Sequence, residues 1–263
     1  MTSLLRKMEV STETNKLLSS LSIVTHLKVC LVAAVSGLTY GLAWRSHEAG
    51  PIGLIGLALF FALQSQLRCW WTVLLSSLIT GATAYLIACS WLSFTIHYLS
   101  GSSETTAQLI APLACLVQAG HFGLFGLSWH LARKWYRQGW TLAPLLWVAV
   151  EEVWPGFFPC KVGNLLVEWP AMCQLASFGG ATLVSFQAAC MAGWLAVLGI
   201  WCWTGWKQQQ WQTTGFKLVA TGGAAIISLQ LLGADRMESL VTQSNSKSPQ
   251  QSNELRVLLV QAD

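Results

Sequence analysis

Long apolar runs with almost no charge, separated by short polar segments, organise most of the chain. A helix needs about 20 apolar residues to cross the hydrocarbon core of a bilayer. Seven runs meet or approach that length: residues 29–44, 50–67, 70–96, 107–132, 140–150, 178–206 and 216–232. The run at 140–150 is short, so it either extends into its neighbours or is partly re-entrant. The pattern predicts an all-α integral membrane protein, a bundle of about seven transmembrane helices.

The two ends of the chain differ from this pattern. Residues 1–25 are polar, and we expect them to form a cytoplasmic N-terminal segment before a seven-helix membrane domain at 26–232. Residues 233–254 are rich in Ser, Gln and Asn, which is typical of a linker. Residues 255–263 form a short run rich in branched apolar residues, which predicts a buried strand. A lone strand has no ladder partners, so we expect it to open a further domain.

The distribution of charge supports an odd number of spans. With a cytoplasmic N-terminus, ten of the fifteen Lys and Arg fall on the inside, as the positive-inside rule requires. These are Arg6, Lys7, Lys16, Lys28, Arg68, Arg133, Lys134, Arg137, Lys207 and Lys217. The C-terminus then lies on the non-cytoplasmic side of the membrane.

Composition narrows the class of protein further. Charged residues make up 10% of the chain, against roughly a quarter in a soluble domain, so most of the surface must face lipid. No basic run is interleaved with aromatics as in nucleic-acid binders, and we expect no nucleic-acid partner. The eight cysteines contain no CxxC pair, and their spacings fit neither a disulfide framework nor a metal site.

The segment at 151–176 is the most unusual stretch, and we expect it to be an outward-facing loop. Prolines, aromatics and glycines in it indicate an irregular, aromatic-lined segment at headgroup depth. A plain surface loop with interfacial aromatic anchors is the alternative. The candidate residues for lipid or substrate approach are Glu152, Trp154, Phe157, Phe158, Pro159, Gly163 and Gln174.

Other ionisable residues in or near the predicted spans give weaker indications of function. His121 and His130 are nine residues apart, on nearly opposite faces of a helix, which favours packing roles over a metal pair. Glu151 and Glu152 lie at a predicted helix end, where water and headgroups can solvate them.

The central motifs resemble the apolipoprotein N-acyltransferases of bacteria. In that family a Pro-containing helix ends in Trp-Val-x-x-Glu, and is followed by Phe-Pro, a Gly, and a Gln-x-Ala-x-x-Gly-Gly stretch that ends near Val-Ser-Phe. The chain has these features in the same order: Pro144, Trp147-Val148, Glu151-Glu152, Phe158-Pro159, Gly163, Gln174, Ala176, Gly179-Gly180 and Val184-Ser185-Phe186. Cys160 stands where many members have Trp, and Trp154-Pro155 where a basic residue is common.

The resemblance implies that the chain is the membrane-embedded portion of an enzyme that transfers an acyl chain from phospholipid to the lipidated N-terminal Cys of lipoproteins. It also implies a bacterial inner membrane, with the C-terminus in the periplasm. Its partners would be a phospholipid acyl donor, lipoprotein substrates and membrane lipids, with no cofactor. The family's Cys, Glu and Lys act on a nitrilase-like domain, whose opening strand residues 257–261 resemble. The resemblance implies that the chain is truncated there, so we expect no catalytic residue in it and no activity from it alone. Cys160 has no identifiable oriented base, which argues against promoting it to nucleophile.

Two other functions stay open at this stage. A seven-helix transporter would need an ion or proton relay, and the predicted spans carry few ionisable residues. A non-catalytic membrane scaffold is the other alternative.

Overall fold

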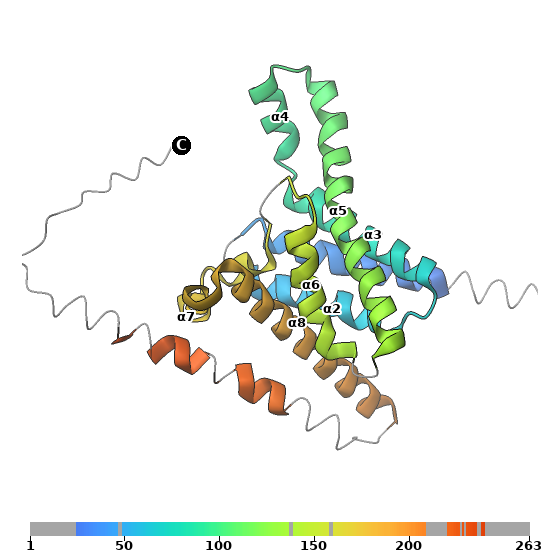
Figure 1. Ribbon diagram of the computed structural model, residues 1–263. Coiled ribbons are helices and arrows are strands. Elements are labelled where there is room, and N and C mark those ends of the chain that lie inside the picture. Colours follow the sequence, from blue (N-terminus) through green and yellow to red (C-terminus); the bar gives the residue numbers. More distant parts are fainter. Residues whose placement is uncertain are drawn as a thin grey trace, which may run out of the picture.

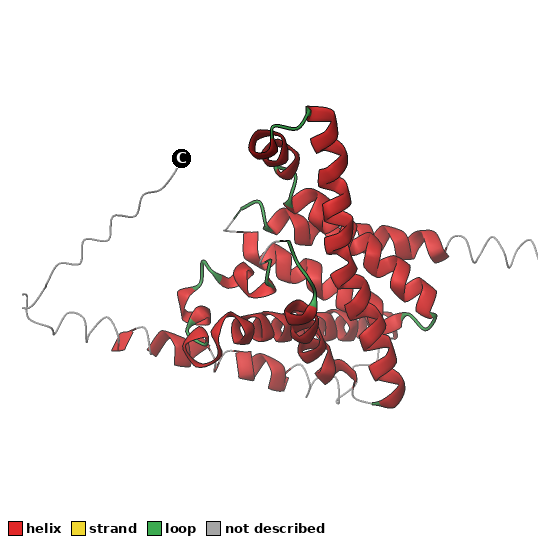
Figure 2. Cartoon of the chain, turned by 45° about the horizontal axis from the view of Figure 1, so that its top comes forward, coloured by secondary structure: helices red, strands yellow, loops and turns green. Residues whose placement is uncertain are grey.

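The computed structural model describes residues 25–46, 49–136, 139–157, 160–208, 220–226, 228, 230–235 and 238–239. All regular elements within these ranges are helical (Figure 2). In this part of the chain, four helices are long and apolar enough to cross a membrane: Thr25–Ala43, Trp70–Ala88, Glu104–Trp135 and Ala176–Trp206. The part of the chain that the structure describes is therefore an all-helical membrane bundle, and the full count of seven spans stays a prediction.

Small residues bring the first helices close together. Helix α2 (Gly50–Gln66) begins with Pro51 in its first turn, where a missing N–H costs little. It crosses the helix Thr25–Ala43, where the Ser36 hydroxyl donates to the Gly56 carbonyl at 2.7 Å. On Gly56, a Cβ would lie 2.6 Å from the Tyr40 nitrogen, so only glycine permits this approach.

The prediction of a single helix over 70–96 is wrong, because two helices cover this range. Helix α3 (Trp70–Ala88) ends at Cys89, and α4 (Leu92–Ser100) begins after a tight turn. The Leu92 N–H donates to the Cys89 carbonyl across this turn. Cys89 and Leu92 are both buried in the core, so packing stabilises the break although no Gly or Pro marks it.

Helices α5 (Glu104–Trp135) and α6 (Gly139–Val153) form the centre of the fold. The 32 residues of α5 exceed the predicted span in both directions, and Ser103 caps its first turn by accepting from the Thr106 N–H. Figure 1 shows α4 and the N-terminal part of α5 projecting away from the other helices. Helix α6 has only 15 residues, about 22 Å at 1.5 Å per residue.

The segment predicted as a loop at 151–176 contains short helices packed into the body. A 3-10 helix, η2 (Val162–Leu166), is followed by α7 (Pro170–Cys173) and by α8 (Ala176–Gln208). Val162 and Leu166 are fully buried, and η2 packs against α2 and α8. The regular part of α8 begins after Gly179 and Gly180, and the φ of +64° at Gly180 favours glycine.

The described parts of the remaining predicted elements are short. In the predicted span at 216–232, the described residues 220–226, 228 and 230–232 are helical. Gly222 lies against the Trp194 ring of α8. The predicted strand at 255–263 and most of the linker fall outside the described residues.

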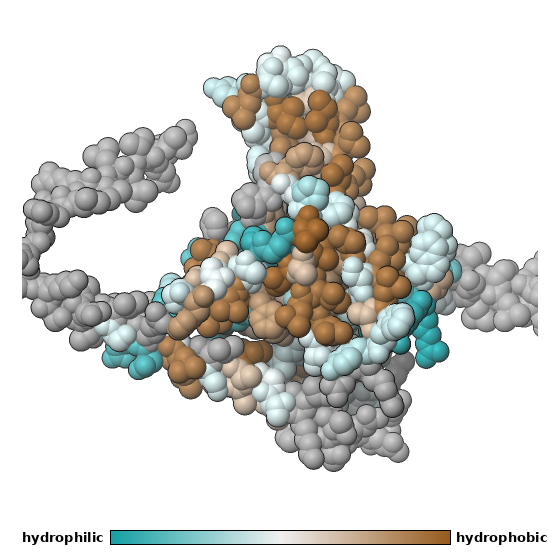
Figure 3. Space-filling model, viewed as in Figure 1, coloured by the Kyte–Doolittle hydropathy of each residue, from teal (hydrophilic) through white to brown (hydrophobic). Residues whose placement is uncertain are grey.

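An aromatic cluster fills the space between α2, α5 and α6. Phe61 of α2 stacks on Phe125 of α5, with ring centroids 5.2 Å apart. Trp147 of α6 is fully buried against both rings. Apolar side chains also cover much of the visible outside of α5, α6 and the projecting α4 (Figure 3). Such a surface is suited to lipid contact.

Candidate functional site

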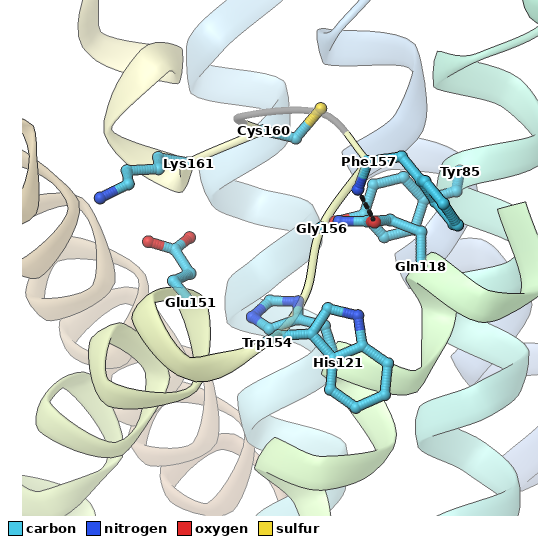
Figure 4. A pocket seen from close by; sticks show the side chains of 9 residues that line it. All are labelled: Tyr85, Gln118, His121, Glu151, Trp154, Gly156, Phe157, Cys160 and Lys161. Carbon is cyan, nitrogen blue, oxygen red and sulfur yellow. Dashed lines mark hydrogen bonds between the residues drawn. The ribbon is translucent and has the colours of Figure 1, made fainter. Parts of the chain in front are cut away.

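A polar cavity of about 270 Å³ lies where α6 ends, beside α3 and α5. Nine residues from these helices and from the segment after α6 line it (Figure 4). They are Tyr85, Gln118, His121, Glu151, Trp154, Gly156, Phe157, Cys160 and Lys161. By the predicted topology, this end of the bundle faces the non-cytoplasmic side.

The Glu151 carboxylate is held in place by one helix turn and one loop. Its Oε1 accepts a hydrogen bond from the indole Nε1 of Trp147, four residues earlier on the same face of α6, at 2.8 Å. The same oxygen accepts from the Val162 N–H, also at 2.8 Å, so the first residue of η2 is tied to α6. Burial raises the pKa of Glu151, and the hydrogen bonds from Val162 and Trp147, together with nearby Ser185 and the Lys161 charge, partly offset that effect.

The neighbouring Glu152 points to a different set of partners. Its Oε1 accepts hydrogen bonds from the Thr182 hydroxyl at 2.6 Å and from the Lys161 ammonium. The Lys161 ammonium and Thr182 hold the pKa of Glu152 below its usual range. The two adjacent carboxylates thus make different contacts. Glu151 faces the interior, and Glu152 joins the loop to α8 near the surface of the protein.

Gly163 lets η2 approach α8. Its N–H donates to the Ser185 hydroxyl at 3.1 Å, and a Cβ at this position would lie 2.8 Å from the Ser185 backbone nitrogen. A side chain here would therefore push η2, and Val162 with it, away from Glu151.

The far wall of the cavity is made by α5. The Phe157 N–H donates to Gln118 Oε1 at 3.2 Å, which fixes the loop over α5 (Figure 4). The Trp154 ring lies directly on Gly120, where a Cβ would clash with it. His121 is buried, with its ring centroid 4.6 Å from that of Trp147.

Several buried polar atoms around this cavity have no hydrogen-bond partner. They are Glu151 Oε2, both ring nitrogens of His121, and Trp154 Nε1. An unpaired buried polar group costs about 1–3 kcal/mol, so four at one place indicate a site that receives polar groups from outside the chain.

Comparison with known proteins identifies the family of the chain. A sequence model described as "Apolipoprotein N-acyltransferase N-terminal domain" matches residues 36–194, more than half of the chain. The chain belongs to the apolipoprotein N-acyltransferase family. The matched range includes α2 to α7, the first part of α8 and all nine residues that line the cavity. No curated protein matches the chain.

The structure of this apolipoprotein N-acyltransferase domain brings some of the expected site residues together. Trp154 and Phe157 line the cavity, and Glu152 binds Lys161, which also lines it. Gly163 does not line the cavity, but its close contact with Ser185 of α8 sets the position of η2. The Gln174 amide donates to the Pro170 carbonyl of its own turn and does not line the cavity. Phe158 and Pro159 lie outside the described residues.

Sequence reasoning assigned no site role to Glu151, His121, Gln118 or Tyr85. It placed Glu151 at a helix end open to water, whereas η2 folds over it. The spacing of Trp147 and Glu151 was a usable signal, because residues four apart share one face of a helix. Gln118 and Tyr85 come from distant helices, and no local pattern connects them to the loop. The packing role predicted for His121 fits its contact with Trp147, and its ring also lines the cavity.

Proposed function

We propose that the chain is the membrane-embedded part of an enzyme in the bacterial inner membrane. This enzyme transfers an acyl chain from a phospholipid to the N-terminal, lipidated Cys of lipoproteins. The N-terminus would lie in the cytoplasm, and the cavity beside Glu151 would face the periplasm. Membership of the apolipoprotein N-acyltransferase family supports this proposal. The chemistry itself would come from a Cys, Glu and Lys outside residues 1–263.

The state of Cys160 supports placing the chemistry elsewhere. A thiol reacts as its thiolate, so a nucleophilic Cys needs a lowered pKa. Burial and the nearby Glu151 charge instead raise the pKa of Cys160 to about 11. Its thiol therefore stays protonated near neutral pH and is a poor nucleophile.

The cavity would receive the polar head of a lipid substrate while the acyl chains remain in the bilayer. Moving each CH₂ from lipid to water costs about 0.8 kcal/mol, so a substrate with long chains is best met at the membrane surface. Glu151 Oε2 is an acceptor without a donor, and the α-ammonium of a lipoprotein acceptor could supply one. Family membership carries the proposed reaction, and the Glu151 carboxylate at the cavity carries the proposed recognition of the amine.

Activity of the isolated chain tests where the chemistry lies. Purified residues 1–263 would be mixed with phospholipid and a diacylated lipopeptide that has a free α-amine, and the triacylated product measured by mass spectrometry. We expect no product. Turnover by this chain would refute the assignment of catalysis to residues outside it.

Binding tests the cavity independently. The same lipopeptide would be titrated into the chain in detergent, beside a version whose α-amine is acetylated. We expect Glu151→Gln to weaken binding of the free amine roughly tenfold, as for loss of a charge-assisted hydrogen bond, and to leave the acetylated peptide unchanged. Glu168→Gln, which removes an exposed carboxylate from the same segment, is the matched control. Equal loss for both peptides would contradict a role for Glu151 in amine recognition.

A further inference from the structure

A second cavity, of about 550 Å³, lies at the other end of α5, where α2 also ends. It is lined by Ser65, Gln66, Leu67, Arg68, His130, Arg133 and Lys134. Thirteen residues of helix, about 20 Å, separate His121 in the first cavity from Lys134 here. The two cavities therefore lie near opposite surfaces of a bilayer whose hydrocarbon core is about 30 Å thick.

The charged side chains that line this cavity are all basic among the described residues. Arg68, Arg133 and Lys134 contribute cations, and no Asp or Glu is among the described residues that line it. By the positive-inside distribution, this end faces the cytoplasm. Basic pockets between helices on that side of a membrane are suited to anionic lipid headgroups.

Arg133 is fixed in position by the end of α2. Its guanidinium donates to the Ser65 carbonyl at 2.5 Å and to the Leu67 carbonyl at 3.1 Å, and it lies 5.2 Å from the centroid of the Trp129 ring. Carbonyls at a helix C-terminus repel anions. Because Arg133 binds two of them, Arg68 and Lys134 remain to attract an anion.

Two buried nitrogen atoms of the cavity have no partner in the chain. Arg133 Nε makes no hydrogen bond, and neither does the Nδ1 of His130, a residue only 6% exposed. A buried imidazole and a buried guanidinium N–H beside an open basic cavity are the groups that a phosphate oxygen would satisfy. Their burial distinguishes this site from a scatter of solvated surface lysines.

Apolar side chains beside the cavity fit a lipid better than a free ion. Leu131 and Trp135 of α5 are 54% and 89% exposed. Trp70 and Trp71, which follow Arg68, are exposed and stack on each other. Exposed aromatics of this kind lie at the headgroup level of a bilayer, with room for acyl chains beside them.

We propose that this cavity binds the phosphodiester head of an anionic phospholipid, through Arg68, Arg133, Lys134 and His130. The site is separate from the cavity beside Glu151, and the proposal does not depend on the acyl-transfer function. The bound lipid would join the end of α2 to the last turn of α5.

Native mass spectrometry of the purified chain tests this proposal. Phosphatidylglycerol and phosphatidylcholine with the same acyl chains would be titrated separately. We expect phosphatidylglycerol to bind about tenfold more tightly, and Lys134→Gln and Arg133→Gln each to weaken its binding about fivefold, with no change for phosphatidylcholine. Arg45→Gln, which removes one exposed cation next to Trp44, is the matched control and should have no effect.

The variants separate a site from a general charge effect. Arg133→Gln also removes a cap from α2, so Lys134→Gln, at an exposed position, is the decisive change. Equal binding of the two lipids would overturn the proposal, as would equal losses in Lys134→Gln and Arg45→Gln. Displacement of phosphatidylglycerol by excess inorganic phosphate would assign the site to free phosphate and overturn the lipid assignment.

Discussion

The indole of Trp147 donates a hydrogen bond to the carboxylate of Glu151 one turn later in α6. Trp147 is fully buried in the aromatic cluster, so the carboxylate is anchored to the centre of the fold. The Val162 N–H binds the same oxygen from the other side. This one carboxylate thus joins the first residue of the 3-10 helix to the end of α6.

Trp147→Phe should remove this donor while keeping most of the ring packing. A lost hydrogen bond to a charged group costs about 1.5–3 kcal/mol, so we expect the free energy of unfolding to fall by about that amount. Unfolding by titration with sodium dodecyl sulfate in mixed micelles measures it. Trp135→Phe, at a residue 89% exposed, should change little. Equal effects of the two substitutions would show that the hydrogen bond contributes nothing.

Gly163→Ala should loosen the packing of η2 on α8. The added methyl would lie 2.8 Å from the Ser185 nitrogen, which is backbone and cannot turn aside. We expect a loss of about 1–3 kcal/mol, as for other overpacked sites, in the same unfolding assay. Gly199→Ala in the middle of α8 has open space around its Cβ and should be neutral or stabilising by up to about 1 kcal/mol. A stable Gly163→Ala protein would contradict the close approach.

Two cysteines should react with iodoacetamide at different pH. Hydrogen bonds from backbone groups of Trp71 and Thr72 lower the pKa of Cys69, whereas burial and Glu151 raise that of Cys160 to about 11. Alkylation of Cys69 should therefore be faster at pH 8, with Cys160 reacting as the pH approaches 11. Peptide mass spectrometry after timed quenching measures both rates.

Glu151→Gln provides the internal check on the Cys160 result. Removing the carboxylate charge makes the thiolate less unfavourable, so the pKa of Cys160 should fall and its alkylation at pH 8 should accelerate. The rate at Cys69 should not change. Slower alkylation of Cys160 in this variant would contradict an electrostatic link between the two residues.

The orientation of the bundle in the membrane can be tested by labelling thiols from one side. We expect Cys69 to lie on the cytoplasmic side and Glu168 on the periplasmic side. A membrane-impermeant maleimide applied to spheroplasts should label Glu168→Cys and leave Cys69 unlabelled. In inverted vesicles the pattern should reverse. Labelling of both positions from one side would refute the predicted topology.

The long apolar runs predicted several of the helices, because uninterrupted apolar runs in a membrane have few alternative structures. The run at 50–67 corresponds to α2 (Gly50–Gln66), and the run at 178–206 falls within α8 (Ala176–Gln208). The break at Cys89 escaped prediction because its residues are as apolar as their neighbours. The burial of Glu151 escaped because the partner that covers it, Val162, lies eleven residues away in an irregular segment.

The shortness of α6 has a consequence for the lipid around it. If α6 crosses the membrane, its length of about 22 Å is less than the hydrocarbon core of about 30 Å, and local thinning of the bilayer is one response to such a hydrophobic mismatch. Pro144 lies inside this helix, and Val153 at its end is 76% exposed. The bilayer should therefore dip beside α6, which would lower the phosphate layer toward Glu151 and shorten the path that a lipid head must travel.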